Sequence, residues 1–252
     1  MQSIKVESIS KTYGAEKSSK KYTVLRNISF EVGTGEFIGV MGPSGSGKTT
    51  LLNILGSIDK PTNGRFIVDG KDITALNKNQ LAKFRRDNIG FIFQDYNLLE
   101  TMTLKENIIL PISLNGTSAN VIEEKVAKLA KDLGIIEVLD KYPYEVSGGE
   151  QQRAAACRAL INDPKLILAD EPTGSLDSRS GKALLNLLTY INTEYNATIL
   201  MVTHDVFAAS YCQKIMFIRD GEIYNELYAG KDRKQFFDSI IDVMSVLGGD
   251  GK

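Results

Sequence analysis

Residues 42–49 read GPSGSGKT and stand between an apolar run, FIGVM at 37–41, and a helical stretch, TTLLNILGSI at 49–58. Glycine, four residues, glycine, lysine and threonine is the spacing of a phosphate-binding loop, whose context is a strand followed by a helix. The small residues allow backbone N–H groups to face an anion. An ordinary glycine turn before a helix is the alternative, but it rarely produces the full pattern in this context. The stretch therefore predicts binding of a nucleoside triphosphate.

The phosphates are expected to lie against the N-terminus of the following helix, where the N–H groups and the helix dipole favour negative charge. The Lys48 ammonium is expected to reach the β- and γ-phosphates, and the Thr49 hydroxyl to hold a Mg²⁺ ion. The residues expected to contact the nucleotide in this stretch are Gly42, Pro43, Ser44, Gly45, Ser46, Gly47, Lys48, Thr49 and Thr50.

The composition is that of a soluble globular protein, with 42% hydrophobic and 24% charged residues in 252. Thirty basic and thirty-one acidic residues give a net charge of −1, which argues against nucleic acid as a partner. Cys157 and Cys212 show no metal-ligand or redox spacing, which favours a reducing compartment. No apolar run approaches the roughly 20 residues of a membrane span, and the N-terminus lacks a signal-peptide core. We therefore expect a cytoplasmic protein that can still dock on a membrane partner.

Strand and helix patterns follow one another along the chain. The first thirty-odd residues alternate between apolar and polar, which predicts an antiparallel sheet. Four apolar runs separated by helical stretches predict a parallel sheet, at 89–93, 165–170, 197–203 and 214–220. The pattern from 103 to 163 is helical. The predicted fold is α/β: a P-loop NTPase core with a mostly parallel sheet, an antiparallel β subdomain and a helical subdomain inserted at about 95–163.

Two helices are predicted from apolar residues at helical spacing. The first follows candidate N-caps at Thr117 and Ser118 and has its apolar face at Ile122, Val126, Leu129, Ala130 and Leu133. The second is an amphipathic helix at 232–247, which Gly248 and Gly249 are expected to end. Its stripe can pack on the chain's own core or serve as a docking surface. We place the main domain at 1–229 and a C-terminal extension at 230–252.

Two further stretches predict chemistry. LILADEP at 166–172 puts Asp170 and Glu171 at the end of an apolar strand, where Asp170 can hold Mg²⁺ and Glu171 can polarise an attacking water. VSGGEQQR at 146–153 opens a helix and predicts a second anion site at Ser147, Gly148 and Gly149. Alone, these would be a polar strand end and a capped helix. Together with the phosphate loop they favour head-to-tail pairing of two copies, in which one copy's second anion site closes over the other's γ-phosphate.

These motifs resemble those of the ATP-binding-cassette ATPases, over about residues 2–225. GPSGSGKT resembles the Walker A loop, LILADE the Walker B strand with its catalytic glutamate, and VSGGEQ the family signature. The resemblance implies ATP hydrolysis with Mg²⁺ and a second copy of the chain as partner. The family's leucine and glutamine beside the signature are replaced by Val146 and Glu150, so the contact of Glu150 with nucleotide is expected but its role stays open.

The same resemblance assigns four more residues. It implies that Gln94 is the glutamine-loop residue, which takes part in catalysis and holds Mg²⁺. Asp177 lies in GSLDS at 174–178, which is similar to the D-loop, and is expected to contact the nucleotide. His204 resembles the switch histidine that binds the γ-phosphate, and Tyr13 is expected to stack on the adenine ring.

The closest branch of the family is indicated by longer stretches. FIFQDYNLLETMTLKENI at 91–108 and ADEPTGSLDS at 169–178 are similar to macrolide exporters and lipoprotein-release systems. ATILMVTHDVFAASYC at 197–212 and the tail are closer to the Bce-type bacitracin and lantibiotic resistance transporters of Gram-positive bacteria. This implies an integral membrane permease as partner and a location on the cytoplasmic face of the membrane. A regulator of the cell-division type, coupled to a membrane protein that does not transport, is the alternative.

The apolar residues around the glutamine loop leave one question open. Such residues can be helical core, or they can form the surface that receives a short cytoplasmic helix of the permease, as the family resemblance implies. They are Leu98, Leu99, Met102 and Leu104.

Overall fold

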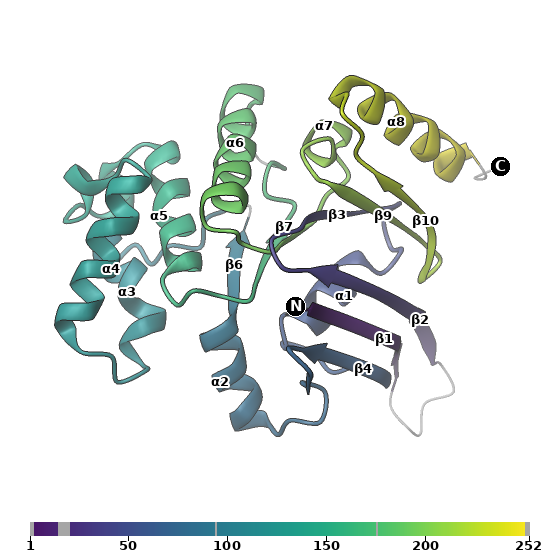
Figure 1. Ribbon diagram of the computed structural model, residues 1–252, viewed down its shortest axis with the longest axis horizontal. Coiled ribbons are helices and arrows are strands. Elements are labelled where there is room, and N and C mark those ends of the chain that lie inside the picture. Colours follow the sequence, from purple (N-terminus) through teal and green to yellow (C-terminus); the bar gives the residue numbers. More distant parts are fainter. Residues whose placement is uncertain (1–2, 15–20, 94, 175, 250–252) are drawn as a thin grey trace.

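Two β-sheets form the centre of this computed structural model, which describes residues 3–14, 21–93, 95–174 and 176–249 (Figure 1). The strands of the larger sheet lie in the order β10 (Glu222–Tyr228), β9 (Lys214–Arg219), β3 (Phe37–Met41), β8 (Ile199–Val202), β7 (Leu166–Asp170) and β6 (Ile89–Phe93). All neighbours pair in parallel except β10 and β9. The prediction of a mostly parallel sheet is confirmed.

The smaller sheet is antiparallel, as the alternating N-terminal pattern predicts. Its strands lie in the order β2 (Tyr22–Gly33), β1 (Ser3–Tyr13), β4 (Asn63–Val68) and β5 (Lys71–Asp72). Helix α1 (Lys48–Leu55) lies between the two sheets in Figure 1. Its apolar residues and those of the antiparallel sheet belong to one core cluster.

The parallel sheet is buried on both faces, because its side chains alternate between two cores. In β3, Ile38 and Val40 join the core that contains α1 and the antiparallel sheet. Phe37 and Met41 join the opposite core, which contains residues of α6 (Ser178–Glu194) and α7 (Val206–Ala209). A strand that is apolar on both faces is the pattern of a parallel sheet with helices on each side. Because these strands are parallel, the loops that follow them meet at one edge of the sheet.

A helical region lies to one side of the sheets (Figure 1). It comprises α3 (Leu104–Ser113), α4 (Ala119–Asp132), α5 (Gly148–Leu160) and the short 3-10 turns η1 (Ile136–Val138) and η2 (Pro143–Glu145), and it faces α2 (Lys78–Asn88). The apolar face predicted for α4 packs inward, with Val126, Leu129 and Ala130 buried. The capping prediction is only half right. Ser118 is the N-cap, but its side chain makes no capping hydrogen bond; the first turn is exposed, so water can satisfy its free N–H groups.

The C-terminal helix α8 (Arg233–Gly249) differs from the prediction at its end. Gly248 and Gly249 were expected to stop the helix, but they form its last residues. A glycine stops a helix by taking a left-handed conformation, and Gly248 has no positive φ. Phe236, Ile240 and Leu247 are buried in the core that contains α6 and α7. The predicted stripe therefore packs on the chain's own core through these three residues, beside α7 in Figure 1, whereas Ile241 of the same stripe is 43% exposed.

None of the helices in these described ranges is both long enough and apolar enough to cross a membrane.

Candidate functional site

The loop at 42–47 joins β3 to α1, and its shape requires glycine at two positions. Gly42 and Gly47 have φ angles of +152° and +106°. A Cβ on Gly42 would lie 2.0 Å from the carbonyl oxygen of Ile218, and one on Gly47 would lie 2.6 Å from Cδ2 of Leu25. Both backbone conformation and space exclude a side chain here. The glycines therefore hold the backbone in a tight turn directly before the helix.

The N-terminus of α1 has properties that suit an anion. Its N-cap is Gly47, which offers no side chain to the first N–H groups of the helix. The Lys48 ammonium donates to the carbonyl oxygens of Gly42 at 2.9 Å and Pro43 at 3.0 Å, so it lies at the loop. Burial lowers the pKa of Lys48, while Glu171 and Asp170 act in the opposite direction. The hydroxyl of Ser46 is buried and has no hydrogen-bond partner among the described residues, which fits a loop that completes its contacts with a ligand.

Two acidic residues lie where β7 ends, at the same edge of the sheet: Asp170 is the last residue of the strand and Glu171 follows it. Burial, and then the neighbouring Glu171 charge, raise the pKa of Asp170, while Lys48 lowers it. Glu171 has a φ of +45°, an unusual conformation for a residue with a side chain. Its N–H donates to the carbonyl of Val202 on β8 at 2.9 Å, which holds this backbone in place. A strained residue that its surroundings hold is a frequent feature of functional sites.

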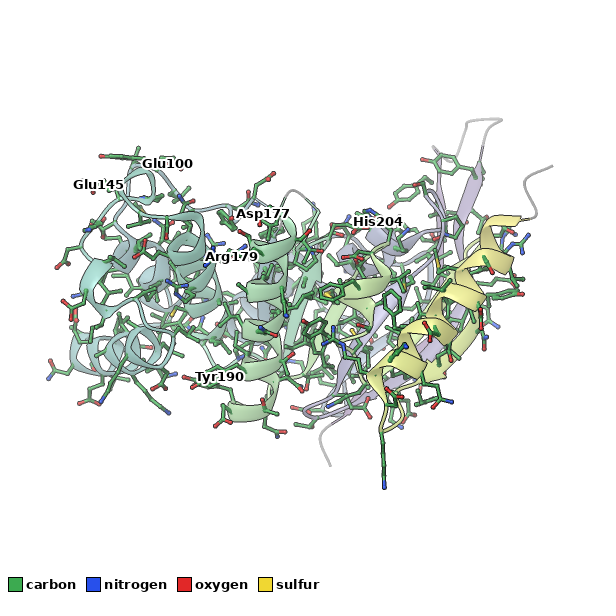
Figure 2. The ribbon with its side chains drawn as sticks, turned by 90° about the horizontal axis from the view of Figure 1, so that it is seen from above. Glu100, Glu145, Asp177, Arg179, Tyr190 and His204 are labelled. Carbon is green, nitrogen blue, oxygen red and sulfur yellow. The ribbon has the colours of Figure 1, made fainter. Side chains whose placement is uncertain are left out.

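The Glu171 carboxylate contacts the histidine that follows β8. Its Oε2 lies 2.9 Å from Nδ1 of His204 and accepts the backbone N–H of His204 at 3.3 Å. The His204 side chain is 70% exposed, whereas that of Glu171 is 27% exposed. The structure thus brings Lys48, Asp170, Glu171 and His204 together at the end of the parallel strands. Figure 2 shows His204 at this edge, with Asp177 further along it.

The chemistry of the donors fits Mg²⁺. Mg²⁺ prefers oxygen ligands and is usually held by one or two carboxylates together with phosphate oxygens of the substrate. Thr49 offers a hydroxyl and Asp170 a carboxylate beside the phosphate loop. Among the described residues no group of three or more His, Cys, Asp or Glu side chains could hold a metal alone. The site therefore fits a metal that arrives with a nucleotide.

Tyr13 lies next to the start of α1. Its hydroxyl donates to Oδ2 of Asp59 at 2.8 Å. Burial raises its pKa, the bond to Asp59 raises it further, and a hydrogen bond with Thr50 lowers it. The Lys11 ammonium lies 4.8 Å from the centre of the ring. Tyr13 is thus held at the helix that carries the phosphate loop, but its stacking on a base stays a prediction.

The second anion site, at the start of α5, has a different geometry. Ser147 is the N-cap, and its hydroxyl accepts the N–H of Glu150. The Glu150 carboxylate in turn accepts the Ser147 N–H at 2.8 Å and the Ser147 hydroxyl at 2.7 Å. These bonds from Ser147 lower the pKa of Glu150. The capped helix start that SGGE alone predicts is thus present, as a capping box whose signal is serine followed three residues later by glutamate.

Asp177 is also engaged in capping. Its Oδ1 accepts the N–H groups of Arg179 at 2.9 Å and Ser180 at 3.1 Å, so it caps α6. Two predicted elements lie outside the described residues: Gln94, and Ser175 within the stretch at 174–178. No contact among the described residues joins Ser147 to the phosphate loop. Figure 2 shows Glu145, two residues before Ser147, far from His204 along the same edge.

A groove lies between α2 and β6 on one side and the helical region on the other. Apolar side chains line it, among them Ile58, Phe91, Phe93, Pro111 and Leu114. Its basic lining residues are Lys83, Arg85, Arg86 and Arg158, and no described carboxylate lines it. Four apolar residues were left open in the sequence as either core or docking surface, and none of them lines the groove: Leu98, Leu99, Met102 and Leu104. Leu104 is fully buried in the core, whereas Leu99 is 45% exposed.

Comparison with known proteins places this geometry in a family. The family model described as ABC transporter matches residues 25–174. The bacitracin export ATP-binding protein BceA of Halalkalibacterium halodurans is 50% identical over 247 residues, covering 98% of this chain and 97% of that protein. The macrolide export ATP-binding/permease protein MacB of Campylobacter jejuni is 45% identical over 210 residues, covering 83% of this chain and 33% of that protein.

A solved structure shows the same fold. It is the dimeric structure of the ATP-binding cassette MJ0796 of Methanocaldococcus jannaschii in a post-hydrolysis state, bound to ADP and Pi. It is 38% identical, with a TM-score of 0.77, and covers 90% of this chain and 99% of that chain. The fold and the phosphate loop define a P-loop ATPase of the cassette type. The chain belongs to the ABC transporter family: it is the ATP-binding subunit of such a transporter, and it hydrolyses ATP.

Proposed function

We propose that this subunit drives a membrane permease that confers resistance to antimicrobial peptides of the bacitracin or lantibiotic type. The supporting observation is the 50% identity with BceA over nearly the whole of both chains. The site would then lie at the cytoplasmic face of the membrane of a Gram-positive bacterium, held there by the permease. The similarity to MacB favours a second candidate, a macrolide or lipoprotein exporter.

Within the site, we propose Glu171 as the residue that polarises the attacking water. Its carboxylate is held by the His204 contact at 2.9 Å and by the strained backbone after β7. His204 is proposed to donate a hydrogen bond to the γ-phosphate. Its contact with the Glu171 carboxylate is proposed to orient that residue. Lys48 binds the phosphates, and Thr49 and Asp170 would hold Mg²⁺. When bound, Mg²⁺ neutralises charge on the phosphate oxygens.

We propose that the catalytic site is completed by a second copy of the chain. Ser147 lies in the helical region, has no contact with its own phosphate loop among the described residues, and is the N-cap of a helix. In a head-to-tail dimer with twofold symmetry, the Ser147–Gly149 turn of each copy would face the phosphates held by the other. The solved relative is described as dimeric, which supports this arrangement.

The groove supports a permease as the further partner. Its apolar lining and exposed Leu114 and Ile58 suit the apolar face of a short helix. Its four basic side chains, without a lining carboxylate, favour a helix that also carries acidic residues. We therefore propose that a cytoplasmic helix of the permease docks here. Lys83→Glu should weaken co-purification of the permease, and the weakening should depend on salt. The control is Lys231→Glu, an exposed residue outside the groove.

The decisive experiment for the substrate is co-expression of this chain with a candidate permease that co-purifies with it. ATPase activity of the purified complex is measured with bacitracin, with a lantibiotic and with a macrolide. Stimulation by a peptide antibiotic and protection of cells that express the complex would support the proposal. Stimulation by the macrolide alone would favour the second candidate, and a complex that responds to none of them while binding a division protein would favour a regulator.

A further inference from the structure

Arg158 connects the groove to the helix that carries the signature. It lies in the last turn of α5 and lines the groove. Its guanidinium donates to the backbone carbonyl of Tyr96 at 2.6 Å and to that of Asn97. No carboxylate in the described ranges pairs with it, and burial lowers its pKa. The charge of Arg158 is thus directed at two backbone carbonyls of a neighbouring segment.

The segment that receives Arg158 has an unusual backbone. Tyr96 and Asn97 have φ angles of +58° and +47°, so two consecutive residues with side chains are left-handed. Such a conformation costs free energy and persists only where its surroundings hold it. The planar fork of an arginine presents its N–H donors to two acceptors in a fixed geometry, whereas a lysine ammonium is a compact charge on a flexible stem. Arg158 therefore helps to hold this turn, together with the hydrogen bond from the Tyr96 N–H to the carbonyl of Phe93 at 3.3 Å.

The Tyr96 side chain reaches the opposite end of the same helix. Its hydroxyl is 3.3 Å from the place where a Cβ on Gly148 would stand. Burial raises its pKa, and the adjacent Gln152 side chain lowers it. Gly148 and Arg158 are about 15 Å apart along a helix. The dipeptide Tyr96–Asn97 thus contacts α5 both at the start that carries the signature and in its last turn.

We propose that Arg158 and Tyr96 are positioning residues that make the segment at 95–97 and helix α5 move as one body. Asn97 and Arg158 both line the groove. A helix seated there would therefore set the position of Ser147–Gly149 relative to the phosphate loop of the partner copy. This inference rests on the proposed docking of the permease in the groove, and it names the residues through which docking acts on the ATPase.

The first test uses the complex of the chain with its permease. Arg158→Lys keeps the charge and loses the fork, and Tyr96→Phe loses only the hydroxyl. Each should lower the permease-stimulated kcat by about tenfold, within the range of residues that carry coupling. In Tyr96→Phe, the KM for ATP and the ATPase rate of the isolated chain should change by less than about twofold. The control is Arg85→Lys, because Arg85 lines the same groove but donates to Ser57 on the opposite wall.

The second test needs no permease. Hydrogen exchange of the isolated chain should become faster both at 96–97 and at 148–152 in Arg158→Lys, and at neither place in Arg85→Lys. If the parent chain does not bind the permease, the proposed docking fails, but the exchange result still decides whether the two segments are joined. Unchanged exchange at 148–152 would overturn the inference. An equal loss of basal and stimulated activity would also overturn it, because it would show a structural role alone.

Discussion

Two helices of this molecule begin at a proposed phosphate site, and they begin differently. Helix α1 starts at Gly47, with no side chain on its first N–H groups, and Lys48 stands beside them. Helix α5 starts at Ser147, where the Glu150 carboxylate already accepts the Ser147 N–H and hydroxyl. One N-terminus has a cation beside it, and the other has the chain's own carboxylate at its N-cap. This difference fits our proposal that α1 binds the nucleotide and that α5 makes a weaker contact, which forms only when two copies meet.

The largest effect is expected from Glu171→Gln, which removes the base but leaves both helix N-termini intact. ATP hydrolysis should fall by about 10²–10⁴-fold, the usual contribution of a general base. ATP binding should persist, so that dimers accumulate with Mg²⁺ and ATP on size-exclusion chromatography. His204→Asn is the companion variant, since it removes the partner of Glu171 at 2.9 Å. Hydrolysis at the parental rate in Glu171→Gln would assign the water to another residue.

The second-largest effect is expected from a change in the α1 site. Lys48→Ala removes the cation beside the open N-terminus, and a hydrogen bond to a charged group contributes about 1.5–3 kcal/mol, so ATP affinity should fall by at least tenfold. Calorimetric titration measures it. The melting temperature without nucleotide should not fall, because burial lowers the pKa of Lys48 and its charge is unfavourable there. Unchanged affinity would mean that Lys48 does not contact the phosphates.

The role of the carboxylate at the α5 site is tested by Glu150→Gln, which keeps the shape of the capping side chain and removes one negative charge. The carboxylate repels an incoming phosphate, and an interaction between two exposed charges is worth about 0.2–1 kcal/mol, so ATP-dependent dimerisation should strengthen by up to about fivefold. The control is Glu106→Gln, since Glu106 forms the same capping box with Thr103 on α3. Weaker dimerisation in Glu150→Gln would show that the carboxylate itself takes part in the site.

The smallest effect is a pH-dependent stability change at Asp170. Burial raises its pKa, so its contribution to stability is present below the ordinary pKa of aspartate and is lost as pH rises through the folded value. At neutral pH, Asp170→Asn should therefore melt at the same or a higher temperature than the parent chain, in EDTA and without nucleotide. The difference should narrow as pH falls. A lower melting temperature at neutral pH, not seen in the exposed control Asp238→Asn, would contradict this.

Most of the fold could be predicted because its signals are local. The run at 37–41 is apolar at every position and is a strand buried on both faces. The end of α8 was predicted wrongly from the glycines at 248–249. A glycine ends a helix only where the chain turns away from the helix, and the sequence does not show where that happens. The domain boundaries and the roles of the site residues stay predictions.

The site could be predicted as a set of residues but not as contacts. The pairing of Glu171 with His204 joins residues 33 positions apart, and only the parallel order of β7 and β8 brings them together. The groove lies between α2 and the helical region, which are distant in the sequence. Its lining residues could therefore not be predicted from the apolar residues at 98–104. The capping box at Ser147 was readable, since its signal spans four residues.

In the proposed dimer, each catalytic site uses the α1 terminus of one copy and the α5 terminus of the other. This arrangement is tested by mixing two inactive variants, Lys48→Ala and Ser147→Arg, and measuring ATP hydrolysis. If sites are shared, a mixed dimer has one site with both changes and one intact site. An equal mixture should therefore regain about a quarter of the parental rate, as expected for random pairing in a symmetric dimer. A chain that carries both changes, mixed with the parent, should form mixed dimers without an intact site. If the two inactive variants stay inactive when mixed, the site lies within a single chain and the account is contradicted.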